Sequence, residues 1–393
     1  MKMKNYDKQL VNTKKYLVNS NKLNLIEYFL LSSKYIDNSE LFNSMRLFKN
    51  LVESGYFEDI TSTSNLEYLL YITIYVNELT RIGIFEKFSN SMNLYLLKLS
   101  EKFVLSYNVK NEEFLFFLFP IIGKVISYLS EFDLNLDVLI NFVIENIEPR
   151  SINGKDIIGF YIRDTNEDFN KQFPNGIFPL GMAHGSLGVL FALSKLYKNN
   201  KLNSDIYVNY LYNLYEIFSK KEDNFSIFPN FVTYEEYKNK DFKTNIKQYR
   251  AAWCSGNLIT SFILFKVCQN MNWNKKAEVY YRYVIEILCQ DIKAYNLEIP
   301  IICHGYSFPL MIINIILREK DLNIYDGCKC EILKCREKEL NDMLFYTLSS
   351  SNITYVIKNK FKNNYSILYG ITGMILALDK SNNSSLEKIL NIK

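Results

Sequence analysis

The chain has 393 residues, of which 48% are hydrophobic and 22% are charged, a composition that excludes a disordered protein and a disulfide-stabilised mini-protein. Its 46 basic and 42 acidic residues leave a net charge of only +4, and no basic block occurs, so we expect no nucleic-acid partner. Seven irregularly spaced cysteines are typical of a reducing compartment, where thiols bind metals or pack in the core. The basic start at residues 1–6 lacks the apolar segment of a secretory signal. The most apolar run, residues 114–129, is shorter than the roughly 20 residues of a spanning helix, so we expect a cytoplasmic protein.

The first hundred or so residues of the chain have a helical pattern. Apolar residues recur at spacings of three and four in residues 23–31 and 66–71, as one buried helix face requires. Residues 115–128 predict another buried helix, broken or kinked at Pro120. With only seven prolines and fourteen glycines in the chain, long helices joined by polar loops are expected.

Two stretches depart from this pattern. Residues 157–162 form a short β-like run, and polar residues and a turn follow before Pro179. Residues 225–249 alternate aromatic and polar side chains and can also hold short strands. We therefore expect one domain over residues 1–393, with an irregular or β-containing extension at residues 148–180.

A repeated glycine is the main structural signal. Gly185, Gly256, Gly305 and Gly370 each open a strongly apolar run, at spacings of 71, 49 and 65 residues. Each interval has room for a helical hairpin and a variable loop, and self-similarity at such spacings indicates a repeat architecture. A weaker copy centres on Gly123. If each glycine begins an inner helix, the fold is all-α, a ring of helical hairpins called an α/α toroid, with long connections between some hairpins.

The residues just before the repeated glycines would then gather at one mouth of the ring. They include both histidines of the chain, His184 and His304, and the cysteines Cys254 and Cys303. Thiolate and imidazole are ligands that zinc prefers, so Cys254, Cys303 and His304 predict a zinc site. Three protein ligands leave a position open, as in catalytic sites, and zinc held by two thiolates readily accepts another sulfur. The sequence thus favours chemistry on a substrate thiol, with His184 left to transfer a proton.

The motifs Gly181-Met182-Ala183-His184-Gly185, Ala252-Trp253-Cys254-Ser255-Gly256, Ile302-Cys303-His304-Gly305 and Tyr369-Gly370-Ile371-Thr372-Gly373 occur in an order that resembles the lanthionine cyclases of lantibiotic biosynthesis. The resemblance is to the stand-alone cyclases of the nisin type, and it is strong from His184 to Leu378. It implies an α/α toroid with zinc at one mouth. The activity implied is addition of precursor-peptide cysteine thiolates to dehydrated Ser or Thr, which forms thioether rings.

Carried over to this sequence, the resemblance makes Cys254, Cys303 and His304 the zinc ligands, His184 the acid/base residue and Arg250 a catalytic neighbour. The implied partners are a dehydrated precursor peptide and, in a membrane-associated complex, a dehydratase and an export ABC transporter. Two departures matter. Ser255 stands where relatives commonly have tyrosine, and the stretch around Phe116 lacks an aspartate that relatives carry.

These departures keep a second function open, that of a degenerate cyclase-like, zinc-binding peptide scaffold in a modification and export complex. Another zinc-dependent thiol-alkylating enzyme on the same kind of toroid is a weaker alternative. We expect the remaining cysteines to play no part in the site: Cys268 and Cys289 are predicted in the core, and the cluster Cys328, Cys330 and Cys335 in a solvated loop or helix end. Tyr306 and Tyr369 can line the mouth, but packing in the core or at the rim is the simpler prediction for them, and Trp253 is predicted in the core.

Overall fold

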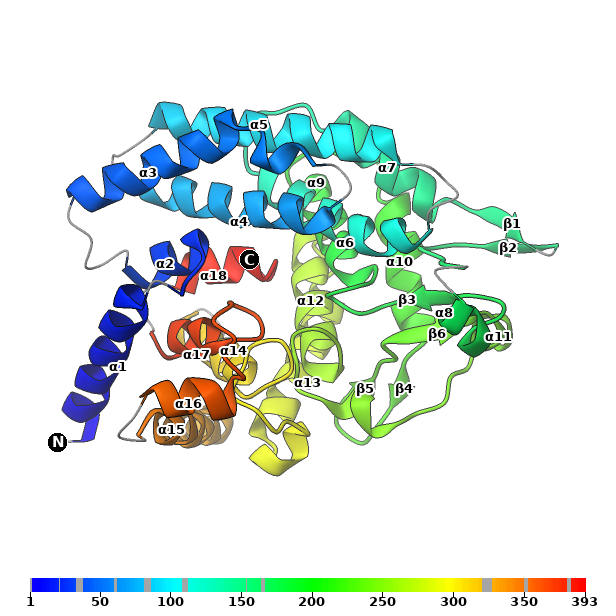
Figure 1. Cartoon of the computed structure of the whole chain (residues 1–393). Coiled ribbons are helices and arrows are strands. Elements are labelled where there is room, and N and C mark those ends of the chain that lie inside the picture. Colours follow the sequence, from blue (N-terminus) through cyan, green and yellow to red (C-terminus); the bar gives the residue numbers. More distant parts are fainter. Residues whose placement is uncertain are drawn as a thin grey trace.

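The computed structural model describes residues 2–20, 22–32, 38–59, 62–80, 86–107, 112–152, 154–163, 167–319, 327–349, 353–379 and 383–393. Helices dominate these segments, and they form an α/α toroid, which confirms the predicted fold class (Figure 1). The α-helices are α1 (Lys2–Asn19), α2 (Leu25–Ser32), α3 (Asn38–Glu53), α4 (Thr63–Thr80), α5 (Glu86–Ser106), α6 (Glu112–Leu129), α7 (Asp137–Ile147), α8 (Glu167–Gln172), α9 (Leu187–Lys198), α10 (Ile206–Ile217), α11 (Tyr234–Asn239), α12 (Asn257–Asn270), α13 (Asn274–Cys289), α14 (Ser307–Arg318), α15 (Gly327–Leu348), α16 (Ile353–Lys360), α17 (Ile371–Leu378) and α18 (Asn383–Ile389). Short 3-10 turns lie at Tyr56–Glu58, Ile246–Tyr249 and Ile292–Tyr295.

Inner and outer helices alternate along the chain. Four inner helices, α9, α12, α14 and α17, begin one or two residues after the repeated glycines, as predicted. Each of α9, α12 and α14 packs against the outer helix that follows it, and α4 and α6 do the same with α5 and α7. Neighbouring inner helices also touch, in the pairs α2–α4, α4–α6, α6–α9, α9–α12, α14–α17 and α17–α2. The inner helices are apolar on nearly every face because neighbours surround them; in α12 and α17 almost every residue is buried.

Helix α6 differs from its prediction in two ways. It runs through Pro120 without a break, and Gly123 lies within the helix rather than just before one. The reason for Gly123 is contact: a Cβ there would lie 2.7 Å from Cγ2 of Val189 and 3.1 Å from its Cα. Gly123 therefore lets α6 approach the backbone of α9 closely, which fixes the position of α6 beside the loop that carries His184.

Short strands lie together with α8 and α11 at one side of the helical body (Figure 1). They form three antiparallel pairs: β1 (Arg150–Ile152) with β2 (Lys155–Ile157), β3 (Ile177–Pro179) with β6 (Phe231–Thr233), and β4 (Lys220–Lys221) with β5 (Ser226–Ile227). The strands predicted in residues 225–249 are thus confirmed as β5 and β6. The run predicted at residues 157–162 is shifted, because β2 ends at Ile157 and only Ile162 bridges to Ile177. In the described segments, no helix has the length and apolarity needed to cross a membrane.

Candidate functional site

The four repeated glycines close four similar loops. A Cβ at each would lie 2.2–2.7 Å from the carbonyl oxygen of the residue six positions earlier; these residues are Pro179, Arg250, Ile299 and Asn364. In three of the loops the residue after the glycine also donates its backbone N–H to that same oxygen, at 2.9–3.2 Å. Any side chain would push the two ends of the loop apart, so glycine is required by close approach of the backbone. The glycine repeat in the sequence therefore reflects one structural feature that occurs four times, a loop closed by the approach of the glycine to the carbonyl oxygen six residues earlier.

Backbone hydrogen bonds then join these loops to one another. Met182 and Ala183 donate to the carbonyl oxygen of Cys254, at 2.9 and 3.2 Å. Trp253 and Cys254 donate to the carbonyl oxygen of Cys303, both at 3.0 Å, and Cys303 donates to that of Leu368 at 3.0 Å. The residues preceding the four glycines are thus held together at one end of the toroid by main-chain contacts.

Within this cluster of loops, Cys254, Cys303 and His304 form a group suited to a metal ion. Their ligand atoms, two Sγ and one imidazole nitrogen, all lie within 4.8 Å of one another. Cys303 is 2% exposed, whereas Cys254 and His304 are half-buried. No other such group of three His, Cys, Asp or Glu side chains occurs in the described part of the chain. Two sulfurs and one imidazole fit zinc and leave room for a further ligand from the open side.

The two thiols of this group share a proton. A hydrogen bond from the Cys303 thiol, with smaller contributions from Ser255 and the charge of Arg250, outweighs burial and lowers the pKa of Cys254 to about 7. The same hydrogen bond, together with burial, raises the pKa of Cys303 well above its ordinary range. The arrangement therefore favours one thiolate, on Cys254, beside a thiol that donates to it. A thiolate already present at neutral pH is a prepared metal ligand.

The side chains around this group act on its charge. Arg250 is half-buried, and its positive charge lowers the pKa of Cys254. The pKa of His304 is lowered mainly by burial and then by the charge of Arg250. The hydroxyl of Ser255 lies 3.8 Å from Sγ of Cys254. Tyr369 hydrogen-bonds the Cys303 thiol, and its ring centroid lies 6.1 Å from that of His304. Tyr369 thus contacts two of the three candidate ligands, and Ser255 places a small polar group beside the third.

The predicted proton-transfer residue, His184, is held by aromatic rings. Its imidazole stacks on Phe116, with centroids 5.3 Å apart and planes at 18°, and meets Phe117 edge-on at 5.5 Å. Both rings belong to the stretch around Phe116 that contains no aspartate. His184 nevertheless remains exposed to solvent as a residue. Burial and the nearby charge of Lys124 hold the pKa of His184 below its ordinary value, whereas the charge of Glu67 acts to raise it.

The sequence alone did not indicate Lys124 and Glu67 as part of this site. Lys124 is 5% exposed, and its ammonium group contacts Oε1 of Glu67 at 2.5 Å. Tyr71 donates to the same oxygen at 2.6 Å, and the Lys124 ammonium lies 5.2 Å from the centroid of the Trp253 ring. Burial raises the pKa of Glu67, but the charge of Lys124 and the hydrogen bonds from Lys124 and Tyr71 together outweigh burial and hold this pKa below its ordinary value. The only signal in the sequence was a lysine within the apolar run 114–129.

The other cysteines and aromatic residues lie mostly as predicted. Cys268 is buried and Cys289 is half-buried against the core. Cys328, Cys330 and Cys335 lie on α15, where two of the three are exposed. Trp253 is 1% exposed and donates its indole N–H to the carbonyl oxygen of Leu390 at 3.0 Å. Tyr306 donates to the carbonyl oxygen of Leu297 and supports the loop.

Comparison with known proteins accords with this geometry. The family described as "Lanthionine synthetase C-like protein" matches residues 122–392, about two thirds of the chain and every loop of the site. The chain belongs to this family. Among solved structures, this lanthionine synthetase C-like protein is similar to one titled "Nisin cyclase", with a TM-score of 0.72 and 18% sequence identity, over 99% of this chain and 98% of that chain. At this identity the likeness concerns the fold. No curated protein sequence matches the chain.

Proposed function

We propose that this protein is a zinc-dependent lanthionine cyclase, which adds cysteine thiolates of a precursor peptide to dehydroalanine or dehydrobutyrine. The observation that carries the proposal is the cluster of Cys254, Cys303 and His304 beside His184, in a chain of this family and fold. The precursor is a peptide whose Ser and Thr have already been dehydrated. A dehydratase and an export ABC transporter are its proposed partners in a membrane-associated complex.

Cys254, Cys303 and His304 would hold zinc. The half-buried Cys254 and His304 give access from the mouth, whereas Cys303 closes the inner side. Zinc bound there would act as a Lewis acid that favours the thiolate form of an incoming cysteine. Arg250 adds positive charge beside Cys254 and His304, and in this position it can stabilise the negative charge that develops on the substrate carbonyl during addition.

His184 would transfer the proton. Because its pKa is lowered, the imidazole is neutral at pH 7 and can accept the proton of the substrate thiol. The thiolate then attacks the β-carbon of the dehydrated residue, the C=C electron pair moves to form an enolate, and the imidazolium returns the proton to the α-carbon. The new C–S and C–H bonds account for the S–H and C=C bonds that are lost, so the peptide mass does not change.

A thiol-loss assay tests this function. The full-length zinc-loaded protein is incubated with a synthetic peptide that contains one cysteine and one dehydroalanine, and free thiol and peptide mass are followed. We expect thiol to disappear at constant mass with the wild type, and to persist with His184→Asn and with Cys303→Ala. The variant Cys335→Ala is the control, since it removes an exposed thiol on α15. Bound zinc with no thiol loss on such peptides would instead favour the peptide-scaffold function.

A further inference from the structure

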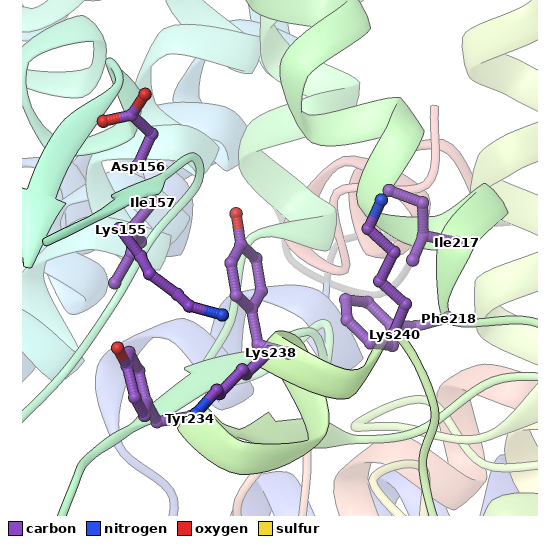
Figure 2. Close-up of a pocket in the computed structure, with 9 residues that line it drawn as sticks. Lys155, Asp156, Ile157, Ile217, Phe218, Tyr234, Lys238 and Lys240 are labelled. Carbon is purple, nitrogen blue, oxygen red and sulfur yellow. The ribbon is translucent and has the colours of Figure 1, made fainter.

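A basic pocket lies away from the metal-ligand cluster, at the side of the molecule that carries the short strands. It has a volume of about 210 Å³ and lies between β2, the end of α10 and α11. Its lining contains Lys155, Lys238 and Lys240, with one acidic residue, Asp156 (Figure 2). In Figure 2 the Asp156 carboxylate points away from the lysine ammonium groups. The pocket is therefore positively charged in a chain whose overall charge is small.

The three lysines of this pocket carry charges that the fold leaves uncompensated. All three are exposed, and none of their ammonium groups forms an ion pair or hydrogen bond with another described residue. The neighbouring acids of α11 are already engaged. Glu236 closes the capping box with Thr233, and Glu235 accepts a hydrogen bond from the amide of Asn175. Acidic side chains from another molecule could form ion pairs with these three ammonium groups.

The floor of the pocket is held in place by ring stacking and a hydrogen bond. The ring of Tyr237 stacks on that of Phe178, with centroids 4.1 Å apart and planes at 12°, and its hydroxyl accepts the backbone N–H of Ile158 at 3.0 Å. Ile157 and Phe218 are buried members of the lining. Apolar walls under a lysine rim suit a peptide segment in which acidic side chains alternate with apolar ones.

The pocket is joined directly to the predicted reaction site. Helix α11 follows β6 without a gap, and β6 pairs with β3 over Phe231–Thr233 and Ile177–Pro179. The strand β3 leads into the loop of His184, and Leu180 in this loop donates to the carbonyl oxygen of Asn230 at 2.8 Å. One pair of strands therefore carries the pocket at one end and the His184 loop at the other.

We propose that this lysine pocket binds an acidic segment of the precursor peptide, outside the residues that form rings. The inference rests on the proposed cyclase function. Charge complementarity commits it to side-chain carboxylates, and the β3–β6 pair connects the pocket to the loop of His184. The pocket holds the peptide while its cysteines and dehydrated residues visit the site, so it acts on substrate binding and not on the chemical step.

The test compares two peptides and two triple variants of the full-length protein. The peptides share a segment with one cysteine and one dehydroalanine, and they differ in an N-terminal extension that carries either four Glu or four Gln. The pocket variant is Lys155→Gln/Lys238→Gln/Lys240→Gln. The control variant, Lys98→Gln/Lys358→Gln/Lys360→Gln, removes the same charge from exposed lysines of α5 and α16.

We expect the pocket variant to raise KM for the Glu peptide about tenfold at low salt with kcat unchanged, since several exposed charge pairs of modest strength are lost. The KM for the Gln peptide, and both values for the control variant, should stay as in the wild type. Equal KM for the Glu peptide in the pocket and control variants would overturn the inference.

Failure of the cyclase proposal has a different result, namely that the wild type consumes thiol from neither peptide. Binding of a fluorescein-labelled Glu peptide, followed by fluorescence anisotropy, then tests separately whether the lysine pocket binds an acidic segment. Weaker binding by the pocket variant than by the control variant supports the inference, and equal binding overturns it.

Discussion

Lys124 and Glu67 form the ion pair on which the interior of the toroid depends, and Lys124→Met tests this dependence. Lys124 is 5% exposed and Glu67 is 28% exposed, so the substitution leaves a largely buried carboxylate without its cation. Breaking a fully buried pair costs about 3–5 kcal/mol, and the partial exposure of Glu67 reduces the expected loss of unfolding free energy to about 2–3 kcal/mol. The double variant Lys124→Met/Glu67→Gln removes both charges and should recover most of this loss.

Urea unfolding followed by circular dichroism measures these differences as a double-mutant cycle. Lys195→Met is the matched control: Lys195 is 12% exposed and pairs with Glu131, but Glu131 keeps Lys388 as a second partner at 2.8 Å. We expect the control to lose less than about 1 kcal/mol. Equal stability of Lys124→Met and the double variant, or of Lys124→Met and the control, would refute the reasoning.

The same substitution should also change the protonation of His184. The charge of Lys124 adds to the effect of burial in lowering the pKa of His184, whereas Glu67 raises it. Lys124→Met should therefore raise this pKa, and the double variant should raise it less. Because the chain has only two histidines, an NMR titration of the imidazole signals resolves His184 once His304→Ala has assigned the other. An unchanged pKa in Lys124→Met would contradict the assigned electrostatics.

Three further substitutions test other parts of the site. Gly305→Ala puts a Cβ 2.2 Å from the carbonyl oxygen of Ile299, so the unfolding free energy measured in urea should fall by about 3 kcal/mol. The zinc content, measured by elemental analysis, should fall as well, and a stable, zinc-loaded variant would refute the loop closure. Phe116→Leu removes the ring stacked on His184 and should lower kcat for thiol loss about threefold to tenfold, while Phe116→Tyr should not; equal rates for the two would exclude positioning by stacking. Arg250→Gln removes a charge that lowers the pKa of Cys254, so in chelator-treated protein the half-maximal rate of alkylation by iodoacetamide should move above pH 7; an unmoved profile would argue against this contact.

The ring and its mouth could be predicted because the loop closure leaves a mark in the sequence. Each closure requires glycine, and the residues before the glycine point to one end of the toroid. The spacing therefore places His184, Cys254, Cys303 and His304 together before any contact is known. The close approach of the ligand atoms of Cys254, Cys303 and His304 accords with this prediction. The roles of these residues and the domain limits stay predictions.

The remaining features depend on contacts between distant segments. Glu67 and Lys124 meet because α4 packs against α6, and although Lys124 lies in an apolar run, nothing in the sequence names Glu67 as its partner. The end of β2 is decided by pairing with β1 and by the bridge from Ile162 to Ile177, not by the apolar run 157–162. The lysine pocket combines residues of β2, α10 and α11 that lie far apart along the chain.

Cobalt substitution tests the central claim most directly, namely that Cys254, Cys303 and His304 hold a metal ion that accepts a substrate thiol. The protein is loaded with Co²⁺ in place of zinc, and its visible absorption is recorded before and after addition of a peptide with one cysteine or the same peptide with serine. The account predicts a tetrahedral cobalt spectrum with thiolate charge-transfer absorption that increases with the cysteine peptide alone and is lost in Cys303→Ala. A wild-type spectrum without thiolate ligation, or one that responds equally to both peptides, would contradict it.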